Sequence, residues 1–446
     1  MPILNSGDIA WILASSALVL VMTPGLAFFY GGLVRNKNVI TTLYQVFAVM
    51  LIVSVQWVVF GYSLAFGPDV FHVIGDLQWA FFNHVGAAPD PNYAPTIPNE
   101  LYGTFQMMFA IITPALIVGG LAERVKFSSF LVFITLWATF IYDPLAHWVW
   151  GVGGWLHNMG ILDFAGGTVV HISSGISGLI CAMYLGKRAE HGSSSIKAHN
   201  VPMVLLGVSL LWFGWFGFNA GSAVGANQLA VNAFLVTNTA TAAAALAWML
   251  VERLMTGHAT LVGASAGAVT GLVAITPACG YVNIEGSLII GALGGVICYF
   301  SSTLLKGHFG YDDALDAFGG HGIGGTWGAI ATGLFATVSV NSGGGNGLFY
   351  GNPHQAVVQL IGVAATWAFS AIGTFILLKL VDVVMGLRVT AEEEKIGLDV
   401  ALHNENAYPE TLTWDVASSI LGSLKRPNIP SELHAEVASP PSEASV

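Results

Sequence analysis

Residues 163–171 read DFAGGTVVH, and residues 313–321 read DALDAFGGH. In each stretch an aspartate precedes a histidine by eight residues, and the second stretch follows the first at a displacement of 150 residues. Both histidines fall in apolar segments, where a polar side chain is costly and turns toward protein or water rather than lipid. The shared spacing indicates an internal repeat in which each half supplies one histidine.

The composition requires a lipid environment for most of the chain. Charged residues make up 9% of the 446 residues, whereas soluble globular domains carry about a quarter. Hydrophobic residues make up 54%, which is more apolar surface than one water-facing domain can bury. This excludes an ordinary soluble enzyme and predicts a protein embedded in a membrane.

Eleven segments are long and apolar enough to be membrane spans, on a template of about 20 residues per crossing. They cover residues 10–30, 39–66, 104–122, 128–149, 166–185, 201–220, 230–251, 259–279, 286–305, 320–338 and 356–385. The expected fold is an all-α membrane protein with eleven transmembrane helices. We expect a transmembrane domain over residues 1–385 and a tail over 386–446, which is ordered at 386–408 and disordered at 431–446.

The basic residues set the expected orientation. All fourteen fall on one side of the membrane under this span assignment. The loops on the other side contain no Lys or Arg; they are residues 67–103, 150–165, 221–229, 280–285 and 339–355. Because cytoplasmic loops carry the excess of basic residues, we expect the N-terminus outside and the tail in the cytoplasm.

The two histidine stretches are displaced by five spans. Five is odd, so the two halves cross the membrane in opposite directions, as in transporters whose substrate site lies at the repeat interface. This plan places His171 and His321 together at a central pore. Two neutral imidazoles can share a proton and leave their outer nitrogens free for a small polar passenger. The alternative is two separate histidines, each satisfied by backbone carbonyls.

Four aspartates lie at or within the spans. Asp163, Asp313 and Asp316 stand at span entrances, where a carboxylate caps a helix and interacts favourably with its dipole. Direct contact with a ligand is the alternative, and a buried Asp163 also adds negative potential that favours a cation. Asp143, just before a proline, is interpreted as structural.

Aromatic residues cluster at the expected outer ends of spans three, four and six. The segments FQMMF (105–109) and WFGWFGFNAGS (212–222) supply most of them. A belt at the membrane interface explains such rings one by one. A cluster of Trp150, Trp215, Phe109 and Ser222 would instead hold a small cation through cation–π contacts and a hydroxyl acceptor.

Motifs for other chemistries are missing from the sequence. No nucleotide-binding, zinc-protease, hydrolase or EF-hand pattern occurs. The three cysteines, Cys181, Cys279 and Cys298, stand far apart, which favours neither a disulfide framework nor a zinc site. We therefore expect no enzymatic activity, no cofactor and no metal.

The chain resembles the ammonium transporter family (the Amt, Mep and Rh proteins), and specifically its Amt branch. The resemblance runs from about Asp8 to Tyr408. It is carried by PGLAFFYGGLVRNKN (24–38), GGLAERVKF (119–127), DFAGGTVVH (163–171), GWFGFNAGS (214–222), GGHGIGG (319–325) and GLRVTAEEEKIGLDV (386–400), in the family's order.

The resemblance implies a homotrimer in the cell membrane, with one narrow hydrophobic pore in each protomer. Carried over residue by residue, Trp150, Phe109 and Ser222 match the outer ammonium site, and Phe109 with Phe218 matches a stacked gate. His171 and His321 match the twin histidines of the pore. Asp163 matches the buried carboxylate of the family signature.

Partners and regulation follow from the same resemblance. It implies ammonium or ammonia as the substrate, with methylammonium as a further candidate, and a PII-type protein that docks on the cytoplasmic face; no nucleic acid is implied. Plant relatives carry a threonine after the tail triplet, whereas Ala401 follows here. Phosphorylation at that position is therefore not expected.

Ammonium transport also fits the physics of an apolar pore. An unpaired ion stripped of water costs tens of kcal/mol, and desolvation lowers the pKa of ammonium, so deprotonation is the low-cost route. The proton either follows along the His171–His321 pair or returns outside, as in a Rh-like electroneutral gas channel. A sensor or receptor is the other alternative, and the 61-residue tail is short for a kinase or cyclase domain.

Overall fold

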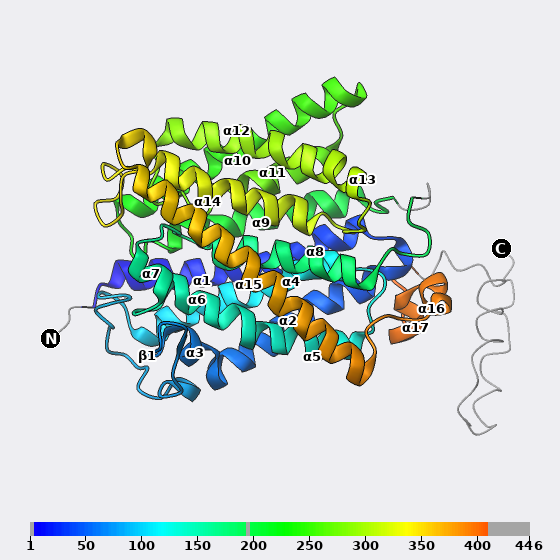
Figure 1. Ribbon diagram of the computed structural model, residues 1–446, viewed down its shortest axis with the longest axis horizontal. Coiled ribbons are helices and arrows are strands. Elements are labelled where there is room, and N and C mark those ends of the chain that lie inside the picture. The colour runs from blue at the N-terminus through cyan, green and yellow to red at the C-terminus, as the bar shows by residue number, and fades with distance from the viewer. Residues whose placement is uncertain (1–3, 193–196, 409–446) are drawn as a thin grey trace, which may run out of the picture.

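The computed structural model describes residues 4–192 and 197–408, and the expected disorder of 431–446 lies outside them. Long helices run along the molecule and their loops gather at two ends (Figure 1). The first described residues lie at one end, where the backbone N–H of Asn5 donates to the carbonyl of Thr96. We call this the vestibule end. The last described helices lie at the other end, which we call the tail end.

The α-helices are α1 (Ser6–Leu33), α2 (Val39–Gln56), α3 (Tyr62–Phe66), α4 (Asn99–Leu121), α5 (Phe127–Trp137), α6 (Asp143–Trp150), α7 (Trp155–Met159), α8 (Ser173–Leu185), α9 (Val201–Gly221), α10 (Gln228–Thr256), α11 (Leu261–Ile275), α12 (Ile284–Phe300), α13 (Lys306–Phe309), α14 (Ile323–Phe335), α15 (Pro353–Met385), α16 (Ala391–Ile396) and α17 (Leu398–His403). Short 3-10 turns are η1 (Asn36–Asn38), η3 (Ala80–Phe82) and η8 (Leu348–Tyr350). Two short strands, β1 (Asp69–Val70) and β2 (Ile74–Gly75), pair antiparallel.

Five π-helical stretches interrupt or open the long helices. They are η2 (Trp57–Gly61), η4 (Ala138–Tyr142), η5 (Gly167–Ile172), η6 (Ser301–Leu305) and η7 (Phe318–Gly322). Such stretches are rare and occur frequently at functional sites. Here η5 contains His171 and η7 contains His321, each directly before a long α-helix.

Each of the eleven expected spans lies mainly on helix. Nine helical stretches among the described residues are long and apolar enough to cross a membrane, and α11 is a shorter apolar helix. The expected span 320–338 corresponds to η7 followed by α14. The chain is thus a multi-pass membrane protein of mostly helical fold, and the count of eleven crossings stays a prediction.

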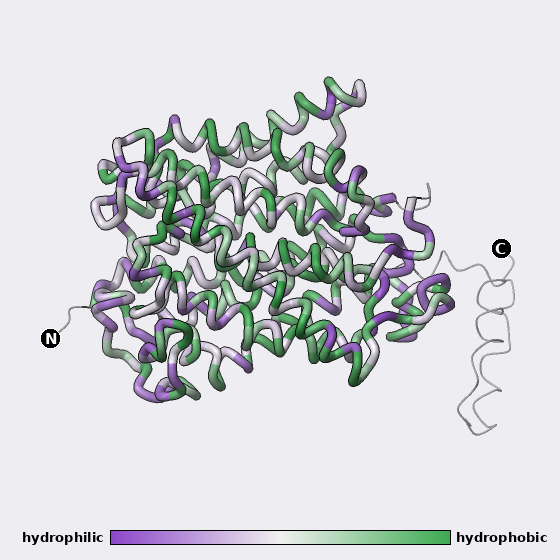
Figure 2. Tube along the Cα trace, viewed as in Figure 1, coloured by the Kyte–Doolittle hydropathy of each residue, from purple (hydrophilic) through white to green (hydrophobic). Residues whose placement is uncertain are grey.

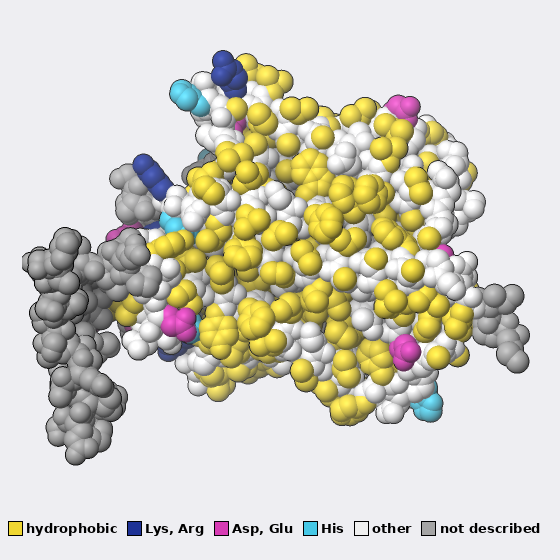
Figure 3. Space-filling model, turned by 180° about the vertical axis from the view of Figure 1, so that it is seen from behind, with side chains coloured by type: hydrophobic (Ala, Val, Ile, Leu, Met, Phe, Trp, Pro, Cys, Tyr) yellow, Lys and Arg dark blue, Asp and Glu magenta, His cyan; other side chains and the backbone are white. Residues whose placement is uncertain are grey.

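The surface matches this placement. Hydrophobic residues run along the helices, and hydrophilic ones concentrate at the two ends (Figure 2). Hydrophobic side chains also cover the flank seen in Figure 3. A soluble protein rarely leaves so large an apolar surface exposed, so the flanks of the helix bundle suit a membrane environment.

Capping residues and small residues explain the helix starts and the close packing. Asn5 accepts hydrogen bonds from the N–H groups of Gly7 and Asp8 at the start of α1, as expected of a helix cap. Gly207 of α9 meets the backbone of Phe29 in α1, and any side chain there would collide with it. Small residues at such crossings let membrane helices approach closely.

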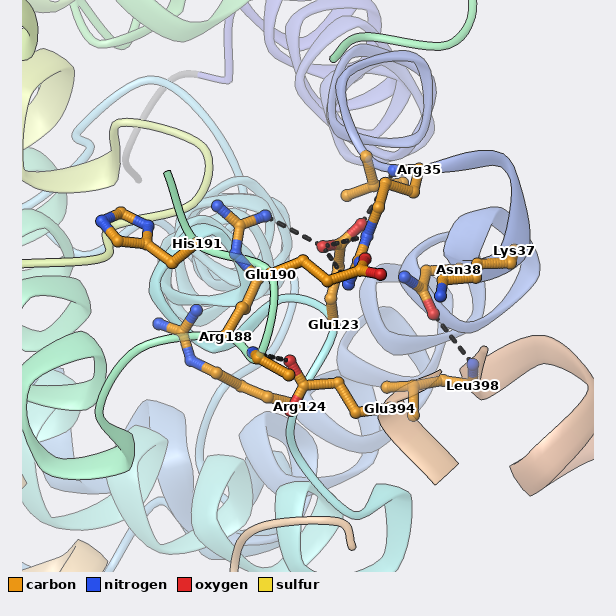
Figure 4. Close-up of polar contacts among 12 residues, drawn as sticks. Arg35, Lys37, Asn38, Glu123, Arg124, Arg188, Glu190, His191, Glu394 and Leu398 are labelled. Atoms are coloured by element: carbon orange, nitrogen blue, oxygen red, sulfur yellow. Dashed lines mark hydrogen bonds and ion pairs between the residues drawn. The ribbon is translucent and has the colours of Figure 1, made fainter. Parts of the chain in front are cut away.

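Buried ion pairs connect the loops at the tail end (Figure 4). Glu123 accepts from Arg35 and Arg188, in each case at 2.9 Å. Asp312 accepts from Arg188 at 2.7 Å and from Arg124 at 3.1 Å. We call these five residues the tail-end ion network. It joins four loops that are far apart in the sequence.

The first part of the tail packs on these loops. Asp399 accepts from the backbone N–H groups of Ile40 at 3.0 Å and Thr41 at 2.7 Å, so it caps the start of α2 from the far end of the chain. Glu394 accepts from the N–H of Ala189 at 2.6 Å and from Arg388 at 2.9 Å. Residues 386–408 are therefore docked on the tail end.

Candidate functional site

A cavity of about 650 Å³ opens at the vestibule end. Phe109, Trp150, Asp163 and Ser222 all contribute to its lining. These residues come from α4, from the end of α6, from the loop before η5 and from the end of α9. The structure therefore gathers the three residues that the sequence predicts for an ammonium site.

The aromatic rings and the hydroxyl are each held in place. The Trp150 indole N–H donates to the carbonyl of Asp163 at 2.9 Å, and its ring meets Phe109 edge to face at 6.1 Å between centroids. The Ser222 hydroxyl donates to the carbonyl of Phe218 at 2.8 Å. This bond uses the hydroxyl proton, so the lone pairs of the oxygen stay available for a cation.

Phe109 lines this cavity and stacks on Phe218, which lines the space around the two histidines. The rings of Phe109 and Phe218 are 4.2 Å apart between centroids with 29° between their planes. Phe109 is 1% exposed and Phe218 is fully buried. The two rings therefore form a buried aromatic pair between the cavity and the histidines.

The two histidines meet on the other side of the stacked rings. The Nδ1 atoms of His171 and His321 are 3.4 Å apart, and the ring of His171 lies 6.0 Å from that of Phe218. At this distance one Nδ1 donates and the other accepts, and the assignment depends on the tautomers. The Nε2 of His171 is buried and has no hydrogen-bond partner among the described residues. This buried nitrogen can therefore accept a hydrogen bond from a small polar molecule or donate one to it, depending on its tautomer.

Glycines allow this meeting. Gly175, four residues after His171, faces the backbone of Gly322, and a side chain at Gly175 would collide with it. The first turn of α8 therefore lies close against η7, one turn after His171 and next to His321.

The space around the histidines is narrow and otherwise apolar. It amounts to about 10 Å³, close to the room needed for one water molecule. Apart from the histidines, its lining is hydrophobic: Met22, Leu26, Ile112, Leu116, Val170, Leu211, Trp215, Phe218 and Val269. An unpaired ion would be costly in such apolar surroundings.

Asp163 caps η5. Its carboxylate accepts from the N–H groups of Gly166 at 2.8 Å, Gly167 at 2.6 Å and Thr168 at 2.7 Å, and also from the Thr168 hydroxyl. These bonds follow the capping interpretation and orient the turn that leads to His171. Asp163 is 5% exposed and also lines the vestibule.

The other aspartates have separate positions. Asp313 accepts from the N–H of Phe318 at 2.8 Å, at the start of the stretch that carries His321. Asp316 pairs with Lys306 at 2.8 Å. Asp143 is fully buried and accepts from Gln56 at 2.7 Å. None of these three lines the vestibule cavity.

The expectation that Trp215 joins the outer aromatic cluster is wrong. Its ring stacks on His171 at 5.3 Å and its indole N–H donates to Thr276 at 2.9 Å, because α9 turns this residue toward the narrow passage. The sequence interpretation also missed Tyr102 and Gln106 in the vestibule lining. Gln106 lies one turn before Phe109, and that helical spacing was the available signal.

The described residues offer no metal site. No group of three or more His, Cys, Asp or Glu side chains in 4–192 and 197–408 is arranged to hold a metal ion.

Comparison with known proteins decides the family. The model of the Ammonium Transporter Family matches residues 10–408. The chain belongs to this family. An ammonium transporter of Bacillus subtilis is 52% identical over 409 residues, which is 92% of this chain and 100% of the relative. The identification from the sequence is therefore confirmed, and the protein is an ammonium transporter of the membrane.

Solved structures agree with the fold. The crystal structure of Saccharomyces cerevisiae Mep2 matches with a TM-score of 0.82 and 37% identity, over 87% of this chain and 88% of that one. A structure described as a sensor Amt protein matches with a TM-score of 0.81 and 29% identity, over 89% and 98%.

Proposed function

We propose that the protein recruits ammonium at Trp150, Phe109 and Ser222, deprotonates it and conducts ammonia past His171 and His321. The observation that carries this proposal is the sequence of environments along one path. A polar vestibule is followed by two stacked rings, then by a narrow apolar passage that contains the two histidines.

Recruitment rests on the vestibule. The faces of Trp150 and Phe109 attract a cation, and cation–π contacts strengthen where water is excluded. The Ser222 oxygen supplies a hydrogen-bond acceptor. Asp163 adds negative potential nearby, while its carboxylate stays engaged with the backbone of η5.

Conduction rests on the passage. Beyond the stacked Phe109 and Phe218 rings, ammonium gives one proton to the unpartnered Nε2 of His171 and becomes ammonia, because an unpaired ion in the apolar passage costs tens of kcal/mol. Neutral ammonia then exchanges hydrogen bonds with the imidazoles. The released proton moves along the contact of the two Nδ1 atoms, which makes transport electrogenic. An electroneutral channel, in which the proton returns to the vestibule, is the alternative.

The proposal extends to topology and assembly. The vestibule end faces outward and the tail end faces the cytoplasm, since the loops of the vestibule end lack Lys and Arg. The two histidine stretches belong to inverted halves around the pore, and the eleven spans form one protomer of a homotrimer in the cell membrane. A PII-type protein docks at the tail end, where residues 386–408 are already packed.

Current measured in proteoliposomes during an ammonium jump tests the proposal. An inward current that saturates with ammonium and is reduced by Trp150→Leu supports it. Ammonia flux without current, measured with a pH dye inside the vesicles, would favour the electroneutral channel. If neither a current nor an ammonia flux is measured, the result would contradict transport and favour a sensor, a role for which one similar structure is named.

A further inference from the structure

A short hairpin at the vestibule end, and the segment just after it, expose large apolar side chains. Phe71 lies between β1 and β2 and is 89% exposed, and Val73 beside it is 45% exposed. Leu77 and Phe81, a few residues further on, are 61% and 66% exposed. We call these four residues the apolar tip. None of them lines the vestibule cavity or the narrow passage.

The backbone holds Phe71 outward in an unfavourable conformation. Its φ is 56° and that of His72 is 64°, in the left-handed region that bulky residues rarely adopt. Phe81 has a φ of 57°. Strained residues of this kind persist only where the surroundings fix them, and they mark functional segments.

The hairpin that carries the tip is hydrogen-bonded to α6 and α7, whose residues also line the vestibule. The carbonyl of Val73 accepts from the Trp148 indole at 2.8 Å, and the carbonyl of His72 accepts from the N–H of Trp155 at 3.2 Å. His72 also contacts the carbonyl of Gly153 at 2.7 Å. The tip is therefore clamped to α6 and α7, directly beside the segment that ends at Trp150.

The tip lies next to the exposed apolar face of α15. Trp148, which holds Val73, packs on Phe369 of α15 at 4.4 Å between ring centroids. Further along α15, Ile372 and Phe375 are 62% and 53% exposed. Figure 1 draws β1 beside α3 at the vestibule end of the bundle. A tryptophan at the end of an apolar flank is typical of the membrane interface.

The acidic residues near the tip are engaged with other groups and do not lie among its apolar side chains. Residues 67–98 contain no Lys or Arg. Asp69 turns inward to His147 at 2.9 Å, and Asp76 accepts from its own neighbour Gln78. His72, beside Phe71, contacts Asp69 at 3.1 Å. The tip has no Lys or Arg for an anionic headgroup, and its recognition is by apolar burial.

We propose that the apolar tip inserts into the boundary between headgroups and acyl chains of the bilayer leaflet at the vestibule end. Phe71 enters furthest, and Val73, Leu77 and Phe81 lie at the same boundary. Through Trp148 and Trp155 this contact anchors the rim of the vestibule to the membrane. The occupant is the lipid itself, and the inference does not depend on transport.

A polarity-sensitive fluorophore on a single introduced cysteine tests this. The three native cysteines are buried, so Phe71→Cys and the control Asn92→Cys are labelled selectively. Asn92 is exposed in the same loop and lines the water-filled vestibule. Both labelled proteins are placed in phosphatidylcholine vesicles with acyl chains that carry a nitroxide near the headgroup.

The expected result is blue-shifted emission at position 71 and quenching by the nitroxide lipid several-fold stronger than at position 92. Aqueous iodide should quench position 92 more strongly than position 71. Equal quenching of both positions by iodide, with none by the lipid, would overturn the proposal. Protection of position 71 from both quenchers would also overturn it, because a second copy of the chain would then cover the tip.

Discussion

The Nδ1 of His171 and the Nδ1 of His321 lie 3.4 Å apart, although the two residues are separated by 150 positions in the chain. Both are nearly fully buried, at 1% and 4% exposure. Each lies in a π-helical stretch that directly precedes a long helix. The equivalent settings make a shared hydrogen bond the natural state of the pair and leave a free nitrogen on His171 toward the passage.

Replacing Trp150 should weaken recruitment more than turnover. Trp150→Leu removes one cation–π face, a contact worth about 0.5–2 kcal/mol, so the half-saturating ammonium concentration should rise about 2- to 30-fold. Concentration series in proteoliposomes measure this. Trp367→Leu is the matched control, since Trp367 bonds Thr326 and does not line the vestibule. An equal rise in the control would contradict the assignment.

Removing Glu123 from the tail-end ion network should destabilise the fold more than removing the exposed Glu190. Its removal by Glu123→Ala leaves Arg35 and Arg188 buried without this partner, and such losses cost about 3–5 kcal/mol. Glu190 also pairs with Arg35, but its side chain is 43% exposed, so Glu190→Ala should cost less than about 1 kcal/mol. Thermal unfolding in detergent compares the two. Similar losses in both variants would refute a stabilising role for the buried network.

The same network predicts acid sensitivity. Burial raises the pKa of Glu123, but the charges of Arg188 and Arg35 outweigh it and hold that pKa below its ordinary value. Burial likewise raises the pKa of Asp312, and Arg188 and Arg124 hold it well below the usual range. A lowered pKa adds stability that is complete above the unfolded values, roughly pH 4, and is lost as the pH falls further. The unfolding temperature should therefore fall below about pH 4, and less steeply in Glu123→Gln.

Asp399 should protect the start of α2. Asp399→Ala removes the acceptor of the Ile40 and Thr41 N–H groups, and loss of a helix cap costs about 1 kcal/mol. Hydrogen exchange at these amides should accelerate, while Asp399→Asn should retain most of the protection. Glu392→Ala, at an exposed position in α16, is the control. Unchanged exchange in Asp399→Ala would show that the tail does not stabilise this helix.

The orientation can be tested by labelling from one side. A cysteine at Asn92 should react with an impermeant reagent added outside intact cells, and one at Lys197 should react only after the membrane is opened. Both positions are exposed, whereas the native cysteines are buried. The reverse pattern would overturn the topology and the outward-facing vestibule.

The sequence predicts the parts of the fold that depend on apolar length and on the repeat. Each expected span lies on helix, and the contact of His171 with His321 follows from the spacing of two short stretches. The site is less predictable because side-chain direction depends on local backbone. The position of Trp215 near the end of a span suggests an outer aromatic cluster, but its side chain turns inward and stacks on His171. The position of a residue in the sequence does not show in which direction its side chain points.

The hairpin and the π-helical stretches are also beyond the sequence patterns. Strands of two residues are too short for an alternating pattern, and a left-handed φ at Phe71 contradicts the preference of that residue type. A π-helical turn contains about one residue more than an α-helical turn. In an apolar segment this extra residue leaves no recognisable sequence pattern. Asp399 caps α2 across the whole chain, a contact that only tertiary structure creates.

Current through His171 variants tests the central claim most directly. His171→Leu removes the shared proton while filling the space, and His171→Glu keeps a protonatable group. In proteoliposomes given an ammonium jump, we predict no current for a folded His171→Leu protein and partial current for His171→Glu. Wild-type ammonium current in the folded His171→Leu protein would contradict the assignment of proton transfer to the histidine pair.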